Sequence, residues 1–357
     1  MNVNESMKNS LEERSLQFCS LFQEKSCATN IIDSKSSGFP YVKWGVDNKL
    51  PYDIWDNYLN CSELQSLINT TVDYIIGDGI TSSNYAHLSD DGDNIDEVVR
   101  KCVFDFVSFG GYAVECIRNQ RGEIVRVNYQ NVMNVRIDED LTTAYLSPKW
   151  NNYSTKNVVT LPLYNATQQQ PHFIYFYRGA ITRGIYPVPM WFSGMKSVQT
   201  LNETRTYNLR NIQNNFAANV MIALNGTSIK SKELQEIKDK IEIGYSGAEN
   251  AGKTLIINNA NSDGKVEITR LESDKAADLY KNVQDSATND LYTAFRINKM
   301  LVGQNVQTGF AAQEFENAYA LYDATTIRPI RNNIQKQFSK LNISIMFNSL
   351  IINWKRD

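Results

Sequence analysis

The stretch Tyr186-Pro187-Val188-Pro189 divides this 357-residue sequence into two halves of different periodicity. Two prolines in four residues disfavour both a regular helix and a central strand, because proline lacks an N–H donor and has a fixed φ. Short patterns of period two dominate the half before this stretch, and long helical patterns dominate the half after it. The stretch therefore marks the point at which the chain changes architecture.

The second half has an unusual order of predicted elements. A first long helix is predicted at Trp191–Ala218 and a second at Lys275–Asn298, where Ser273 and Asp274 suit the N-cap. Between the two helices we predict a compact insert of strands and one helix: Val220–Leu224, Ser231–Ile243, Thr254–Ile257 and Lys265–Arg270. A strand–helix–strand module between two long helices is therefore expected.

The C-terminal part continues with a polar loop and a third long helix. The loop is predicted at Lys299–Ala312 and the helix at Gln313–Leu341, with Pro329 inside it. Proline removes one helical hydrogen bond, so a kink is expected at Pro329. Short terminal strands are predicted at Ile343–Phe347 and Leu350–Asn353.

The first half is predicted to combine helices with an antiparallel sheet. Apolar residues at steps of three and four predict a helix from about Trp55 to Ile76 and another at Val98–Phe109. The period then changes to two and predicts a hairpin and further short strands. Those strands are Tyr112–Arg118, Ile124–Tyr129, Val132–Ile137, Thr142–Leu146, Val158–Leu163 and Phe173–Tyr177. The fold class is therefore α+β. A polar N-terminal arm at residues 1–36 precedes these elements.

Composition excludes several functional classes. The formal charge is −3, from 36 Lys+Arg and 39 Asp+Glu, so a strongly basic DNA-wrapping protein is excluded. Only two histidines, His87 and His172, are present, which makes His-rich zinc sites and His-based acid–base catalysis poor candidates. The five cysteines are scattered without a CxxC pair, so reduced thiols in a cytoplasmic setting are expected. No stretch approaches the roughly 18 apolar residues of a membrane span, and we expect a soluble intracellular protein.

One motif, Gly247 to Thr254, matches the P-loop pattern letter for letter. A P-loop needs a strand before the glycines and a helix that begins at the Lys-Thr pair, because the helix N-terminus binds the phosphates. Here a helix is predicted before the loop, and the β-branched strand from Thr254 follows it. We therefore interpret Lys253 as part of a glycine connector between a helix and a strand.

The remaining candidate sites are weak. The acidic loop Asp90–Asn94 fails the spacing of a calcium-binding EF-hand loop, because Cys102 stands where the closing glutamate belongs. His172 precedes a strand, and a structural role is its default interpretation. No nucleophile, base and orienting partner come together in the sequence. We therefore predict a non-enzymatic protein without cofactor or metal.

The order of elements in the second half resembles that of tailed-bacteriophage portal proteins of the long-tailed-phage type. Four stretches carry the resemblance, and they occur in the order expected of that family: Asn214–Asn219, Asn250–Leu255, Arg296–Gly303, and Glu314–Ala318 through Thr326–Ile330. The similarity covers residues 186–347 well and the first half in outline. Val188-Pro189 stands where the family usually has Ser-Pro.

The resemblance implies a domain organisation and a function. Residues 37–190 would be the wing, 191–219 and 273–298 the two stem helices, 220–272 the clip, 299–312 the tunnel loop, and 313–357 a kinked helix with terminal strands and a short crown. Copies would form a ring, a dodecamer, at one capsid vertex of the virion after assembly in the host cytoplasm. Double-stranded DNA would be packaged and ejected through the ring. Terminase, a head–tail adaptor and capsid or scaffold proteins would be partners, and no membrane would be involved.

In those roles, particular residues would face DNA. In the stem these are Lys275, Lys281, Arg296 and Lys299, which are interspersed with Asp278, Asp285 and Asp290. In the tunnel loop they are the neutral Gln304, Asn305, Gln307 and Thr308, with Gly303 and Gly309 as hinges. A channel of mixed charge would not hold DNA tightly, because each neutralised phosphate adds affinity through counterion release.

Two other functions stay open on the sequence alone. The P-loop pattern allows an ATP-dependent DNA translocase, for which Lys253 would bind nucleotide. The structural composition also allows another capsid or adaptor component without a central channel.

Overall fold

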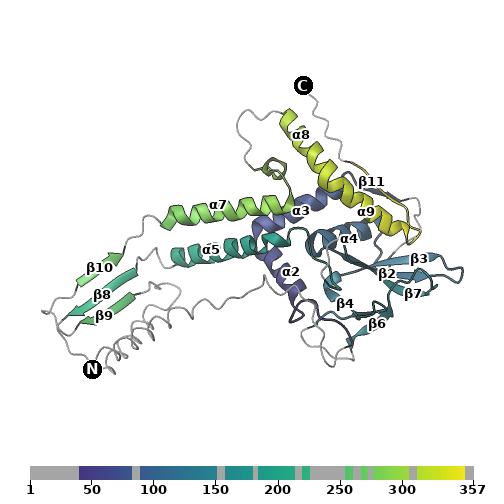
Figure 1. Cartoon of the computed structure of the whole chain (residues 1–357), viewed down its shortest axis with the longest axis horizontal. Coiled ribbons are helices and arrows are strands. Elements are labelled where there is room, and N and C mark those ends of the chain that lie inside the picture. Colours follow the sequence, from purple (N-terminus) through teal and green to yellow (C-terminus); the bar gives the residue numbers. More distant parts are fainter. Residues whose placement is uncertain are drawn as a thin grey trace, which may run out of the picture.

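The computed structural model describes residues 40–82, 89–150, 157–179, 184–213, 219–225, 254–259, 267–271, 276–304 and 312–349. Within these residues the fold is α+β, as predicted. A body of helices and small sheets carries a pair of long helices that projects from it, and a three-stranded sheet lies at the far end of that pair (Figure 1). None of the described helices is long and apolar enough to span a bilayer.

The first predicted helix is two helices. They are α2, Leu50–Asn60, and α3, Ser62–Ile76, separated by Cys61 in an extended conformation at φ −115° and ψ 106°. Cys61 is fully buried at this corner, where it also accepts a weak hydrogen bond from Arg205 at 3.8 Å. The prediction of one continuous helix was wrong because the apolar pattern runs across the corner without a glycine or proline to mark it.

Helix α4, Ile95–Phe109, begins three residues earlier than predicted. Its N-cap Asn94 accepts from the Glu97 backbone N–H at 3.0 Å, and the Glu97 carboxylate accepts from the Asn94 N–H at 2.8 Å. This reciprocal capping box satisfies two backbone donors that a helix start otherwise leaves unpaired. The helix ends at Gly110, which has a left-handed φ of 89°.

The body also contains two three-stranded antiparallel sheets. One has the order β3-β2-β7 and the other β4-β5-β6. Their strands are β2 Tyr112–Arg118, β3 Ile124–Gln130, β4 Val135–Ile137, β5 Thr143–Leu146, β6 Val159–Pro162 and β7 His172–Tyr177. The predicted strand from Val132 was too long, because Val132–Asn134 form a 3-10 turn, η2, that Asn131 caps by accepting from the Met133 N–H at 2.9 Å.

The C-terminal region returns to the body and closes it. Strand β11, Ile345–Phe347, pairs antiparallel with β1, Ile80–Ser82. Buried Arg331 donates to the carbonyls of Tyr74 and Ile75 at 2.8 and 2.7 Å. A guanidinium at the C-terminal end of α3 is favourable because the last carbonyls of a helix lack partners.

The projecting part is formed by two helices and the strands between them. They are η4 Phe192–Gly194, α5 Met195–Gln213, β8 Asn219–Asn225, β9 Thr254–Asn259, β10 Glu267–Leu271 and α7 Ala276–Phe295. Helices α5 and α7 pack side by side along the projection (Figure 1). The predicted first helix began too early, at a 3-10 turn, and the predicted second helix extended too far, because it ends at Phe295.

The third predicted helix has three parts. They are α8 Ala312–Tyr322, the π-helical segment η6 Asp323–Ile327 and α9 Arg328–Ser339, preceded by the 3-10 turn η5 Lys299–Val302. Pro329 lies in the first turn of α9, directly after the π-helical segment. The wide turn is consistent with Pro329, because its ring would collide with the carbonyl four residues earlier in a regular α-helix.

Some predicted elements lie outside the described residues. These are the N-terminal arm, the helix at 231–243, the N-cap residues Ser273 and Asp274, and the last strand at 350–353.

The base of the projecting pair depends on a close approach at Gly194. A Cβ built there would lie 2.8 Å from Leu291 Cδ2 and 3.3 Å from the Ala294 Cβ. Leu291 is fully buried, so it has little room to move away. We expect Gly194→Ala to lower the free energy of unfolding by about 1–3 kcal/mol through overpacking, measured by chemical denaturation. Ser193→Ala, at the exposed neighbouring position, is the control and should change it little; equal effects would contradict this account.

Asp105 on α4 is a buried carboxyl that holds the helix against β3 and η2. Its Oδ2 accepts from the Tyr129 hydroxyl at 2.9 Å and from the Val132 N–H at 3.1 Å. Burial raises the pKa of Asp105 to about 7, although these two hydrogen bonds favour the charged form. The Asp105 carboxyl group is therefore neutral at low pH. Above neutrality it ionises, and the buried charge lowers the free energy of unfolding.

The pH dependence of stability follows from this raised pKa. The contribution of Asp105 to the free energy of unfolding is complete below its pKa in the unfolded chain, near 4. It is lost as the pH rises through about 7, the pKa in the folded protein. Relative to Asp105→Asn, the wild type should lose on the order of 3 kcal/mol between those limits. Denaturation at a series of pH values measures the difference, and parallel pH profiles for the two proteins would exclude the proposed titration.

Candidate functional site

The exposed face of α7 is a polar surface that includes residues singled out from the sequence. Lys281, Asp285, Asp290 and Arg296 are all exposed along the helix and the turn after it. The opposite face packs inward through Ala287, Leu291 and Phe295. Lys281 and Arg296 are 15 residues apart, or about 22 Å along an α-helix, so these residues form a stripe with a cation at each end and two carboxylates between them.

The base of the stripe is fixed to the body by stacked aromatic rings. Trp191 and Phe295 stack with centroids 6.0 Å apart and planes within 5°. The Trp191 indole N–H donates to the Val107 carbonyl of α4 at 2.9 Å. Both rings are fully buried, so this contact positions α7 relative to the body.

A groove with a volume of about 390 Å³ runs beside this anchor, between the start of α5 and the end of α7. The Ser197 hydroxyl donates to the Asp290 carboxylate across it at 3.2 Å. Its lining is Met190, Ser193, Gly194, Ser197, Asp290, Thr293, Ala294 and Arg296. The groove is therefore polar, with one carboxylate and one guanidinium.

Arg296 has an unusual backbone conformation. Its φ is 55°, in the left-handed region that glycine prefers. The N–H of Arg296 bonds to the Thr293 carbonyl and that of Ile297 to the Tyr292 carbonyl, both at 3.1 Å. This pair of bonds is the Schellman arrangement, in which glycine usually occupies the position of Arg296. The guanidinium thus stands where the backbone favours a residue without a side chain.

The turn after α7 contains three of the residues predicted from the sequence, which are Lys299, Gly303 and Gln304. Asn298 caps η5 by accepting from the Met300 N–H at 3.0 Å, and the Lys299 ammonium lies 5.6 Å from the centroid of the Tyr292 ring. Gly303 has a φ of 77°, and a Cβ built there would meet nothing within 4 Å. Gln304 is exposed, and its N–H donates to the Lys299 carbonyl at 3.1 Å.

Helix α3 holds both this turn and α5 in place. The Tyr74 hydroxyl donates to the Leu301 carbonyl at 2.9 Å. Arg205 of α5 makes an ion pair with Glu63 at the start of α3. Burial alone would raise the pKa of Glu63, but the hydrogen bonds from Arg205 hold it below its ordinary value.

The structure brings Arg296, Lys299, Gly303 and Gln304 together at the base of the helix pair and places Lys281 farther along it. Pro329 lies elsewhere, in α9. Five predicted residues lie outside the described part of the chain: Lys275, Asn305, Gln307, Thr308 and Gly309. Sequence reasoning missed Trp191, Phe295 and Gly194 as the anchor, since a Trp, a Phe and a Gly far apart in the chain carry no local signal of contact.

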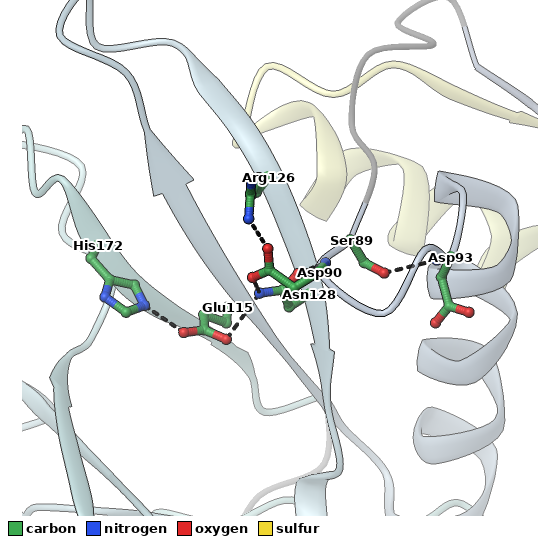
Figure 2. A network of polar contacts seen from close by, with 7 residues as sticks. All are labelled: Ser89, Asp90, Asp93, Glu115, Arg126, Asn128 and His172. Carbon is green, nitrogen blue, oxygen red and sulfur yellow. Dashed lines mark hydrogen bonds and ion pairs between the residues drawn. The ribbon is translucent and has the colours of Figure 1, made fainter.

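The acidic loop and His172 belong to a polar network on the body (Figure 2). Glu115 of β2 accepts from Asn128 and Gln130 of β3, at 3.3 and 2.9 Å, and contacts His172 Nε2 at 2.5 Å. Asp90 is bound by Arg126 and Asn128. The carboxylates are thus engaged in structural contacts, and no cluster of metal-binding side chains occurs among the residues that the structure describes.

The P-loop pattern ends in a strand. Thr254 is the first residue of β9, which pairs parallel with β8, and no helix begins there. The preceding motif residues, including Lys253, lie outside the described residues. A helix N-terminus that could hold phosphates is therefore missing at Thr254, as predicted.

Comparison with known proteins defines the class of fold. No protein-family model and no curated protein sequence matches the chain. Among solved structures, the chain matches a chain from the neck of a native gene transfer agent particle computed with C12 symmetry, with 11% identity, a TM-score of 0.54 and 84% of each chain covered. A chain from the virion of a native gene transfer agent particle matches with 10% identity and a TM-score of 0.57, over 84% of this chain and 83% of that one.

A third match names the fold. An HK97-family phage portal protein from Corynebacterium diphtheriae matches with 12% identity and a TM-score of 0.52, over 82% of this chain and 94% of that one. The chain therefore has the fold of phage portal proteins. The resemblance inferred from the order of elements is confirmed at the level of the fold.

Substitution of Arg296 separates its backbone strain from its charge. We expect Arg296→Gly to raise the free energy of unfolding by about 1 kcal/mol, because glycine adopts the left-handed conformation without the steric cost of a Cβ. Arg296→Ala is the matched control: it removes the same charge but keeps the Cβ, so it should not stabilise. Chemical denaturation measures both, and destabilisation by Arg296→Gly would show that the guanidinium makes contacts that stabilise the fold.

Proposed function

We propose that this chain is a portal subunit, twelve copies of which form a ring at one capsid vertex of a virion. Double-stranded DNA would be packaged and ejected through the ring. The observation that carries the proposal is the projecting pair α5 and α7, in a fold shared with an HK97-family portal protein and with the neck of a C12-symmetric particle. The role is non-enzymatic and needs no cofactor.

The elements take roles in this ring. Helices α5 and α7 are the stem, the β8–β10 sheet belongs to the clip, and residues 299–312 form the tunnel loop. The body built from residues 40–190, with β11, is the wing. Because the clip sheet is the part most distant from the wing (Figure 1), it is the surface that we assign to terminase and to the head–tail adaptor. The wing would contact capsid or scaffold proteins as the ring assembles in the host cytoplasm.

The charge of the α7 face suits a DNA conduit. Lys281 and Arg296 lie at the two ends of this face, and Asp285 and Asp290 lie between them, all exposed. Each cation that binds a phosphate releases counterions and adds affinity, and each nearby carboxylate opposes that binding. The balance permits brief contacts without tight retention. The tunnel loop would continue this balance with the neutral Gln304, Asn305, Gln307 and Thr308, between hinges at Gly303 and Gly309.

Two other functions are alternatives to the portal role. An ATP-dependent translocase would rely on Lys253, but the strand that begins at Thr254 removes the helix N-terminus that a P-loop requires. A capsid or adaptor component without a channel is compatible with the fold class alone. The shape of the assembled particle distinguishes it from a portal.

Electron microscopy of the purified full chain tests the proposal. We expect rings of twelve subunits with a central hole that admits duplex DNA, and native mass measurement should give the same copy number. Magnesium ATP should leave the melting temperature of the wild type and of Lys253→Ala unchanged. A solid particle or a stable monomer would contradict the portal role, and ATP stabilisation lost in Lys253→Ala would favour the translocase.

A further inference from the structure

The small sheet at the end of the helix pair has two edges that no described strand covers. Its strand order is β10-β8-β9, so β8 is central and β9 and β10 are the outer strands. Among the described residues no strand pairs with the outer side of β9 or of β10. An outer strand leaves a row of backbone N–H and C=O groups that can pair with another strand.

The strands have the sequence pattern of a sheet interior. The central strand contains five consecutive apolar residues, Val220 to Leu224, and β9 contains Leu255-Ile256-Ile257. Uninterrupted apolar runs are typical of strands covered on both faces, whereas a strand with one face in water alternates. A three-stranded sheet that projects away from the body (Figure 1) therefore needs further protein surface around it.

The directions of the two edges are complementary. Strand β8 runs parallel to β9 and antiparallel to β10, so β9 and β10 are antiparallel to each other. The β9 edge of one copy can thus pair with the β10 edge of a second copy as an ordinary antiparallel ladder. Because this contact uses two different edges, it is head-to-tail. Its repetition does not stop at a dimer, and it gives a ring when the rotation between copies closes.

We propose that β9 of each copy pairs with β10 of the next, so that the small sheets form one continuous closed band. This inference rests on the proposed ring. Three strands span about 14 Å across the strands, so twelve copies give a band roughly 170 Å in circumference and about 55 Å in diameter. A band of that size surrounds duplex DNA with room to spare.

The ring symmetry also predicts the register between copies. Within one copy, Met221 pairs with both Leu255 and Thr269, and so these three positions lie in one row across the sheet. If the strands run parallel to the ring axis, the rotation that relates one copy to the next keeps each row at the same position along that axis. Leu255 should therefore lie opposite Thr269 of the next copy.

The row two residues farther along β8 gives a second pair of positions. Ala223 pairs with both Ile257 and Glu267, so Ile257 should lie opposite Glu267 of the next copy. A tilt of the strands would shift the register by two residues and place Leu255 opposite Glu267.

Paired cysteines test the contact in the assembled full chain. Leu255→Cys/Thr269→Cys and Ile257→Cys/Glu267→Cys, oxidised with copper phenanthroline, should give a ladder of covalent multimers up to the full ring on a non-reducing gel. Opposed antiparallel residues lie close enough for a disulfide, whereas these two positions within one copy are two strands apart, about 10 Å, and cannot be bridged. Leu255→Cys/Glu267→Cys tests the tilted register.

The controls isolate the contact between copies. Each single variant should give the pattern of the parent chain, and Met221→Cys/Thr269→Cys, on neighbouring strands of one copy, should give no ladder. A ladder from any of the three test pairs supports the edge contact. Intact rings without a ladder from all three would overturn this inference and leave the portal proposal standing, whereas absence of rings by electron microscopy would overturn the portal proposal itself. Covalent dimers alone would also exclude the head-to-tail contact.

Discussion

The stacked rings of Trp191 and Phe295 are the contact on which the projecting half of the molecule depends. They join the start of one long helix to the end of the other, and the Trp191 indole fixes both to α4 through the Val107 carbonyl. Gly194 permits the close approach of the two helices at that point. The helix pair is held at one end, so a small rotation at its base would move its far end by a large distance. This buried contact therefore helps to set the direction of the helix pair.

Away from the base, the helices have progressively less cover from their own chain. On the inward face of α5, Val198 and Leu201 are buried, whereas Leu209, farther along, is 55% exposed. A helix in water gains most of its stability from packing of its apolar side, so a partly uncovered pair is incomplete as a monomer. Neighbouring copies in the proposed ring would supply the missing surface, and β9 and β10, whose outer sides no described strand covers, indicate the same need at the far end.

The sequence predicted the elements whose signals are local. The hairpin of β2 and β3 followed from period-two alternation around Gly122, and the order of long helices and insert strands led to the correct fold. The corner at Cys61, the π-helical segment before Pro329 and the helix end at Phe295 were missed, because tertiary packing determines them. Arg296 and Lys299 were named as candidates from the resemblance, but only the structure shows that Arg296 lines a groove at the base of the helix pair and that Lys299 begins the turn that follows.

Arg296 has both a strained backbone conformation and an exposed charge. A left-handed conformation is disfavoured for an arginine by about 1–2 kcal/mol, and glycine at the same place would form the same Schellman bonds without that cost. Strained residues persist where surrounding structure enforces them, and they concentrate at functional sites. The exposed guanidinium stands at the end of a stripe in which carboxylates match the cations, next to a turn whose described residues carry one other cation, Lys299. The strained backbone and the exposed charge together make Arg296 a candidate for the proposed contact with DNA.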